Sequence, residues 1–320
     1  MAELAIIIGN GFDIDLGLPS KYSQFIEGDE WEKIVNTIIL SSKNDYRKHS
    51  LIYHLYKESN SDSKKDWFNI EEEIKQFIHE HPKCSNDEVD DIKMEFDILQ
   101  KALKEYLIRV SSKCKMDIEK YPYMFINKLT NCLKKIVVFN FNYTNPINFL
   151  PSQDRCPQFL KNQISIHGNL DNDSIIIGCN EQEKKYYNSS LSFMYKHNML
   201  NNTINITQSL LDAKDVVFYG HSINDMDFCY FKDFFNYVST ENKNKKNITI
   251  ITKDEDSERT IRDNIYNQGI TVSSLFDKPN SFEFIHTQKL NDQNKEELQK
   301  WVNMLERISK RNSRGIRRIN

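Results

Sequence analysis

Residues 4–13 read Leu-Ala-Ile-Ile-Ile-Gly-Asn-Gly-Phe-Asp, and they carry the strongest signal for the fold. The apolar run Leu4–Ile8 is typical of a strand that is buried on both faces of a parallel sheet. Gly9 and Gly11 follow, and a glycine turn leaves backbone N–H groups for an anion and lets a phosphate approach closely. The stretch predicts a phosphate-binding turn after the first strand of an α/β fold. The alternative is a tight turn without a ligand.

The glycine turn differs from the two commonest phosphate-binding motifs. A dinucleotide fingerprint needs a third glycine at position 14, where this chain has Ile14, and no P-loop lysine follows the turn. A dehydrogenase-type site and a P-loop are therefore disfavoured. Valine at position 9 or 11 is expected to abolish ligand binding while the fold stays largely intact, because its side chain would fill the space of the phosphate.

Three more runs predict buried strands, and two shorter runs are weaker candidates. The strong runs are 136–141, 216–219 and 248–252, and the weaker ones are 163–166 and 175–177. Helical patterns between strong runs are typical of parallel strands that are joined by crossover helices. The predicted fold class is α/β, with a Rossmann-like, mostly parallel sheet.

A large helical insertion is predicted inside this sheet domain. Between Ile8 and Ile136 there is no convincing strand, whereas a single crossover needs only about a dozen residues. The insertion, 26–130, is expected to pack over the carboxyl ends of the strands as a lid. The remaining parts are a Rossmann-like nucleotide-binding core, 1–25 and 131–290, and a C-terminal helix with a basic tail, 291–320. Helical patterns in the insertion lie at roughly 30–40, 45–58, 66–80, 87–113 and 120–134.

The composition argues against several classes of protein. The 320 residues carry a formal net charge of -3, which gives no global field that would attract nucleic acid. Neither a signal peptide nor the roughly 20 uninterrupted apolar residues of a membrane helix are recognisable, so a cytoplasmic protein without membrane contact is expected. The 6 cysteines lack Cys-x-x-Cys spacing, and His79, His81 and Cys84 have no second cluster, so neither disulfides nor a metal are expected.

Polar residues follow the other predicted strands as well. Asn142 and Thr144 come after the run 136–141, and the carboxyl ends of parallel strands open on one crevice. His167 ends the run 163–166, where a histidine can titrate near neutral pH and act on a ligand hydroxyl. The alternatives are an Asn-rich turn and a hydrogen-bonded structural histidine. Asp225, in the turn after the run 216–219, is interpreted as a helix cap.

In combination, these motifs resemble the bacterial abortive-infection AbiH family of anti-phage proteins. The family is in turn distantly similar to sirtuin-like NAD-consuming domains. This chain departs from the sirtuin pattern at Asn10 and at Phe12-Asp13, which replace small residues, and at Thr144, which stands where aspartate is usual. It also lacks a four-cysteine zinc module. The matching motifs are GNGFDIDLGLPSKYSQF at 9–25, WFNIEEEI at 67–74, FNYT at 141–144, IHGNL at 166–170 and YGHSINDMD at 219–227.

The resemblance implies an anti-phage enzyme that binds NAD and hydrolyses its nicotinamide–ribose bond without a metal. Asn142 would then orient the water or the nicotinamide amide. His167 would contact or deprotonate a ribose hydroxyl, and Asp13 would lie near the ribose or the nicotinamide. The implied nucleotide-binding residues are Gly9, Asn10, Gly11, Phe12, Glu71, Thr144, Gly220, His221, Ser222 and Asp227.

Trp67 and Glu71 match the family's Trp-x-x-x-Glu pattern. At i and i+4 they share a helix face, so Glu71 is expected to point into the crevice while Trp67 packs beside it. The alternative is a surface glutamate beside a core tryptophan.

Two other functions fit the same residues. One is a nucleotide-sensing module without turnover, whose insertion signals to a partner. The other is a nuclease-like toxin that uses Asp13, Glu71, Asp225 and Asp227 as metal ligands. The expected partners are NAD or a related nucleotide, a phage-derived trigger or a partner defence protein, and further copies of the chain in a homo-oligomer. The basic segment 307–320 is interpreted as a solvated tail.

Overall fold

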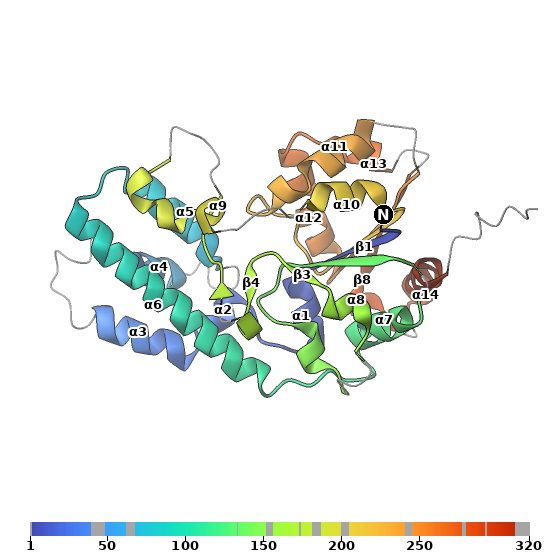
Figure 1. The fold of residues 1–320 in the computed structure, drawn as a ribbon, viewed down its shortest axis with the longest axis horizontal. Helices are drawn as coiled ribbons and strands as arrows, with labels where there is room; N and C mark the ends of the chain where they lie inside the picture. The colour runs from blue at the N-terminus through green and yellow to red at the C-terminus, as the bar shows by residue number, and fades with distance from the viewer. Residues whose placement is uncertain are drawn as a thin grey trace, which may run out of the picture. The chain divides into compact units, whose positions relative to one another are not determined.

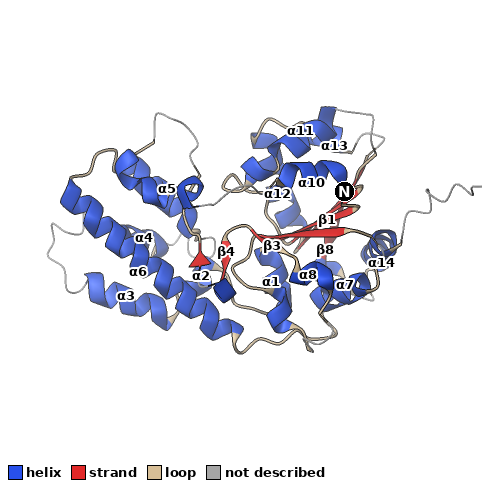
Figure 2. Cartoon of the chain, viewed as in Figure 1, coloured by secondary structure: helices blue, strands red, loops and turns tan. Residues whose placement is uncertain are grey.

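The computed structural model describes most of the chain, which folds into two compact units, each built from separated segments (Figures 1 and 2). The first unit consists of Met1–Gly17, Lys115–Ile166 and Ile204–Asn320, and the second of Leu18–Cys114 and His167–Thr203. The described residues are 2–39, 49–61, 68–132, 134–151, 156–172, 174–180, 187–199, 205–240, 245–276, 280–291 and 293–310.

The first unit contains a six-stranded parallel sheet with the strand order β3-β2-β1-β6-β7-β8. When only the strands of this sheet are numbered along the chain, their order is 3-2-1-4-5-6, which is the order of a Rossmann fold. In that fold a ligand binds where the strand order reverses. That switch point lies between β1 and β6. The predicted α/β, Rossmann-like fold is therefore confirmed. The strands are β1 (Leu4–Ile8), β2 (Ile136–Asn140), β3 (Ile164–Ser165), β6 (Asp215–Tyr219), β7 (Asn247–Thr252) and β8 (Ser281–His286).

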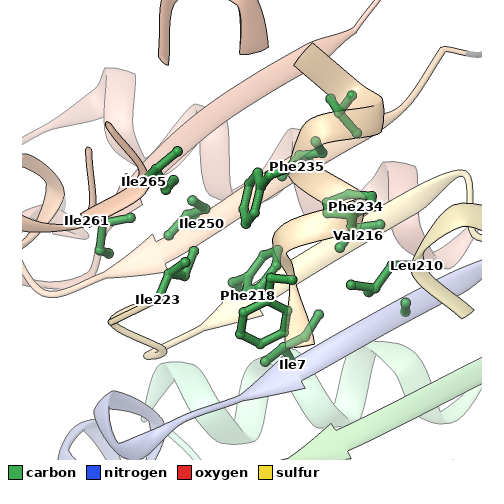
Figure 3. Close-up of a cluster of buried hydrophobic side chains, with 14 of the residues drawn as sticks. Ile7, Leu210, Val216, Phe218, Ile223, Phe234, Phe235, Ile250, Ile261 and Ile265 are labelled. Atoms are coloured by element: carbon green, nitrogen blue, oxygen red, sulfur yellow. The ribbon is translucent and has the colours of Figure 1, made fainter. Parts of the chain in front are cut away.

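Helices cover both faces of this sheet, which is why the central strand β1 is apolar along its whole length (Figure 1). On one face, Val216 and Phe218 of β6 join a buried cluster with side chains of the covering helices (Figure 3). On the other face, the ring of Tyr219 packs edge-on against Phe12 and Phe125. The first set of helices is α10 (Ile206–Asp212), α11 (Lys232–Thr240), α12 (Glu255–Asn267) and α13 (Val272–Leu275); the second is α1 (Asn10–Leu16), α7 (Tyr121–Thr130) and α14 (Lys295–Ser309).

Short elements complete the first unit. The helix α8 (Gln158–Lys161) lies between β2 and β3 along the chain. The 3-10 turns are η2 (Pro146–Phe149), η7 (Phe228–Tyr230) and η8 (Thr287–Lys289).

The second unit is mainly helical. Its longest helix, α6, begins with a capping box in which the side chains of Ser85 and Glu88 each accept the other's backbone N–H. The buried Glu95 of α6 accepts hydrogen bonds from Ser50 Oγ and Ile52 N–H, and so fastens the start of α4. The helices are α2 (Tyr22–Phe25), α3 (Asp29–Ile39), α4 (Leu51–Ser59), α5 (Ile70–Glu80), α6 (Asn86–Ser111) and α9 (Lys196–Met199). A small antiparallel pair, β4 (Gly168–Asn169) and β5 (Ser174–Ile175), and the turns η4 (Leu170–Asn172) and η6 (Ser189–Met194) accompany them.

The division into units differs from the boundaries expected from the sequence. The helical unit begins at Leu18 and ends its first segment at Cys114, so α7 belongs to the sheet unit. It also takes in the segment His167–Thr203, which was assigned to the core. The reason is that η6 and α9 in this segment pack in the helical unit, η6 against α6.

No helix within the described ranges is long and apolar enough to span a bilayer. Two sequence-based expectations fall outside those ranges: the placement of Trp67, and most of the basic tail, residues 311–320.

Candidate functional site at the switch point of the sheet

The turn after β1 leads directly into a helix. Gly9 is the extended N-cap of α1, which begins at Asn10. The N–H of Gly11 donates to the carbonyl of Gly220, at 2.8 Å, and the N–H of Phe12 donates to the carbonyl of Gly9, at 2.9 Å. These two N–H groups therefore have protein acceptors, and the expectation that they face an anion needs correction.

The three glycines of this region are required by the close approach of two backbones. A Cβ added to Gly9 would lie 2.6 Å from His221 Cα, and one added to Gly11 would lie 2.6 Å from Gly220 Cα. Gly220 has φ +66 and its own Cβ would lie 2.3 Å from the backbone nitrogen of Phe12. Valine at position 9 or 11 must therefore displace the loop after β6, residues 220–227, which we call the β6 loop. This contradicts the expectation that the fold would stay largely intact.

A buried polar cluster lies beside this turn. Thr144 Oγ1 donates to Asp13 Oδ2 at 2.5 Å, and Asn142 Nδ2 donates to the carbonyl of Gly9 at 3.1 Å. The loop after β2 is itself held by Asn140, whose side chain accepts from the N–H of Asn142 and donates to the carbonyl of Thr144. The structure thus brings together Gly9, Asp13, Asn142 and Thr144, four of the residues expected in the site.

Asp13 is the unusual member of this cluster. Its side chain is buried, and burial raises the pKa of Asp13 to about 7, although the hydrogen bonds from Thr144 and Asn142 act in the opposite direction. Asp13 Oδ1 is buried and has no hydrogen-bond partner among the described residues. An unpaired buried acceptor calls for an explanation, and a bound water or ligand that donates to it is the usual one.

The β6 loop, residues 220–227, contains five of the residues that the sequence analysis singled out. His221 is buried, with its ring against Phe141, and Asp227 Oδ2 lies 3.7 Å from His221 Nε2. Ser222 is exposed. Asp225 is not a helix cap: its Oδ1 accepts from Gln268 Nε2 at 2.7 Å, and the next helical turn begins only after Asp227.

Two expected site residues belong to the helical unit. His167 is buried, and its carbonyl accepts the N–H of Ile176 at 2.8 Å. Glu71 of α5 is also buried, and its Oε2 accepts from Nζ of the fully buried Lys196 at 2.9 Å. The convergence of His167 and Glu71 with Asn142 on one ligand stays a prediction. Lys196 was missed because nothing in the sequence links positions so far apart.

A second carboxyl on α1 was also missed. Burial raises the pKa of Asp15 to about 6, and Thr287 Oγ1 donates to Asp15 Oδ1 at 3.2 Å. Burial, followed by the charge of Asp15, raises the pKa of Tyr219 well above its ordinary value. The pattern Asp-x-Asp at positions 13 and 15 was the available signal. A spacing of two places the two carboxyls on different sides of a helix, so Asp15 has surroundings of its own.

The fold and the cluster define a class: a Rossmann-like α/β protein with a buried, partly unsatisfied polar site at the switch point of its sheet. The chain matches the family model described as bacteriophage abortive infection AbiH over residues 5–252, and it belongs to that family. Family membership supports a role in abortive infection, the defence against bacteriophage. No curated protein and no solved structure matches the chain.

Proposed function

We propose that this AbiH protein binds NAD or a related nucleotide at the switch point and hydrolyses the nicotinamide–ribose bond during phage infection. The observation that carries the proposal is the buried carboxyl of Asp13, whose Oδ1 lacks a partner within the described chain. It lies beside Asn142 and Thr144, next to the place where Rossmann-like sheets bind nucleotides. The sirtuin-like order of the motifs gives the reaction its type.

Cleavage of the nicotinamide–ribose bond requires little proton transfer by the protein. Nicotinamide leaves as a neutral group from a cationic precursor, so its departure needs no general acid. The site must stabilise an oxocarbenium-like ribose and deliver water to it. The ionised form of Asp13 favours that positive charge, and its Oδ1 can accept a hydrogen bond from a ribose hydroxyl, from the water or from the nicotinamide amide.

The remaining roles follow the motifs. Asn142 is held by its hydrogen bond to the carbonyl of Gly9, and so its amide is fixed in orientation before a ligand enters. In the proposal it orients the water or the nicotinamide amide. His167, which comes from the helical unit, contacts or deprotonates a ribose hydroxyl. The phosphates lie near Gly9, Asn10 and Gly11, with the N–H groups of Gly11 and Phe12 already engaged by protein carbonyls.

A sensor without turnover is the second candidate, because it needs the same polar cluster for binding but no delivery of water. Because the glycine turn donates two of its N–H groups to the protein itself, it offers a phosphate fewer donors than an open turn does. Such a site would bind a nucleotide and pass the signal to a phage-derived trigger, a partner defence protein or another copy of the chain.

The nuclease reading gains no support. Two of its four proposed metal ligands have protein partners, since Lys196 donates to Glu71 and Gln268 donates to Asp225. Within the described residues no group of three metal-ligating side chains is assembled.

Incubation of the purified protein with NAD separates the leading proposal from the sensor. Release of nicotinamide by the wild type, and its loss in Asn142→Ala and His167→Ala, supports the hydrolase. If the two residues act as one unit, the double variant should be scarcely worse than either single one. Tight binding without product supports the sensor, and neither binding nor product contradicts both. Metabolite profiling of expressing cells, before and after infection, then identifies which nucleotide is consumed.

A further inference from the structure

The loop after β6 holds a buried isoleucine in an unfavourable backbone conformation. Ile223 has φ +50, and it is the non-glycine residue with positive φ among those described. Its side chain is fully buried in the apolar cluster between the sheet and its covering helices (Figure 3). A β-branched residue seldom adopts the left-handed region, so surrounding contacts must hold it there.

His221 provides one such contact. Its Nδ1 accepts the backbone N–H of Ile223 at 2.9 Å. A ring nitrogen that accepts a hydrogen bond carries no proton, so in the neutral ring the proton lies on Nε2, which faces Asp227 Oδ2 at 3.7 Å. The ring is also fixed sideways, because Phe141 and Phe231 pack edge-on against it.

The backbone that His221 holds is the one that packs against the glycine turn. The Cα of His221 occupies the space in which a Cβ on Gly9 would lie, and the adjacent carbonyl of Gly220 accepts the N–H of Gly11. The conformation of the β6 loop therefore limits where the start of α1, and with it Asp13, can lie.

We propose that His221 is a positioning residue for the switch-point site. Its Nδ1 holds the left-handed turn at Ile223, which keeps the β6 loop against the glycine turn, and its imidazole does not contact the ligand. This role differs from direct nucleotide binding, which the sequence motif implied for His221. The expected effect on NAD binding rests on the proposed function, whereas the expected effect on the turn at Ile223 does not.

Two substitutions at His221 separate the roles of its nitrogens. Asparagine places an acceptor near the position of Nδ1, where it can accept the backbone N–H of Ile223. Glutamine places its polar end near the position of Nε2 instead. His221→Asn should keep a higher melting temperature than His221→Gln and bind NAD at least tenfold more tightly than that variant. His197→Gln, at an exposed histidine of the helical unit, is the control and should match the wild type in both measurements. Equal loss of NAD affinity in both variants at the wild-type melting temperature would show that the imidazole contacts the ligand, and the inference would be overturned.

A double-mutant cycle keeps the inference testable if NAD proves not to be the ligand. Glycine adopts positive φ without strain, so Ile223→Gly should lower the melting temperature less in the His221→Gln background than in the wild type. Equal decreases would mean that His221 does not support the turn, and so contradict the inference. In protein with ¹⁵N-labelled histidine, the resonance that His221→Asn removes should show a proton on Nε2 at neutral pH, and a proton on Nδ1 would also overturn it. If the wild type fails to bind NAD while these two results hold, the proposed function fails and the positioning role stands.

Discussion

Each of the two units buries a carboxylate that the sequence marks as a site residue. In both, one carboxylate oxygen has no hydrogen-bond partner among the described residues, but only one of the two carboxylates has a counter-charge. Glu71 in the helical unit accepts a hydrogen bond from the fully buried ammonium of Lys196. Asp13 in the sheet unit receives hydrogen bonds from neutral groups, Thr144 and Asn142, and is raised in pKa to about 7 by burial. A buried charge with its counter-charge can serve the fold, whereas one without it is costly and indicates a functional site.

Removal of Lys196 should give the largest change in stability. In Lys196→Met the carboxylate of Glu71 stays buried without its cation, which should lower the free energy of unfolding by about 3–5 kcal/mol. Denaturant titration measures this, with Lys101→Met, at an exposed lysine of the same unit, as the control. The double variant Glu71→Gln/Lys196→Met should recover part of the loss. If Lys196→Met is as stable as the control, the pair does not serve the fold.

Valine at Gly11 should have the next largest effect. Its Cβ would lie 2.6 Å from the Cα of Gly220, so the two loops must separate. We expect the free energy of unfolding to fall by about 3 kcal/mol or more, since the obstacle is backbone. Gly269→Ala is a useful comparison, because a Cβ there meets nothing within 4 Å and only its positive φ is strained. A Gly11→Val variant that melts with the wild type would contradict the observed packing.

The sequence predicted the fold more accurately than it predicted the surroundings of Asp13 and Glu71. Leu4–Ile8 matches the predicted strand residue for residue, because an apolar run before glycine has few other interpretations. The strand Ser281–His286 was missed because Glu283 interrupts its apolar pattern. The motifs named Asp13, Asn142 and Thr144, which do lie together. They did not show that Gly9 and Gly11 serve loop packing, because a glycine that meets a phosphate and one that meets a backbone look alike in sequence.

Asp13→Asn should separate activity from stability, in contrast to substitution at Lys196. An amide can still accept from Thr144, but it carries no charge and no titratable proton. We expect nicotinamide release to fall by about 100-fold or more, while the fold is kept. Unchanged turnover at pH 7 would exclude Asp13 from the reaction, whatever the variant's stability.

The same variant predicts a pH dependence of stability. The pKa of Asp13 is about 7 in the folded protein and near its ordinary value of 3.8 in the unfolded chain. The folded state therefore binds the proton more tightly, so this stabilisation is fully present below pH 3.8 and is lost as pH rises to about 7. Its upper bound is on the order of 4 kcal/mol. Asp15 acts in the same direction, so the quantity to measure is the difference between Asp13→Asn and the wild type, which should grow in favour of the variant from pH 4 to pH 7. A difference that does not change with pH would mean that Asp13 is not desolvated.

The smallest expected effect comes from Thr144→Val, which keeps the shape of the side chain and removes one hydrogen bond. Thr144 Oγ1 donates to Asp13 Oδ2 at 2.5 Å, and this contact favours the ionised carboxylate. Without it the pKa of Asp13 should rise further, by about half a unit to one unit. If ionised Asp13 is the active form, the acidic limb of the profile of kcat/KM against pH should move upward by the same amount, with little change in the plateau above it. Ser at position 144 keeps the hydroxyl and should leave the limb where it is in the wild type. If the acidic limb moves equally in Thr144→Ser and Thr144→Val, the effect comes from packing and not from the hydrogen bond. If it moves in neither variant, a group other than Asp13 titrates in that limb.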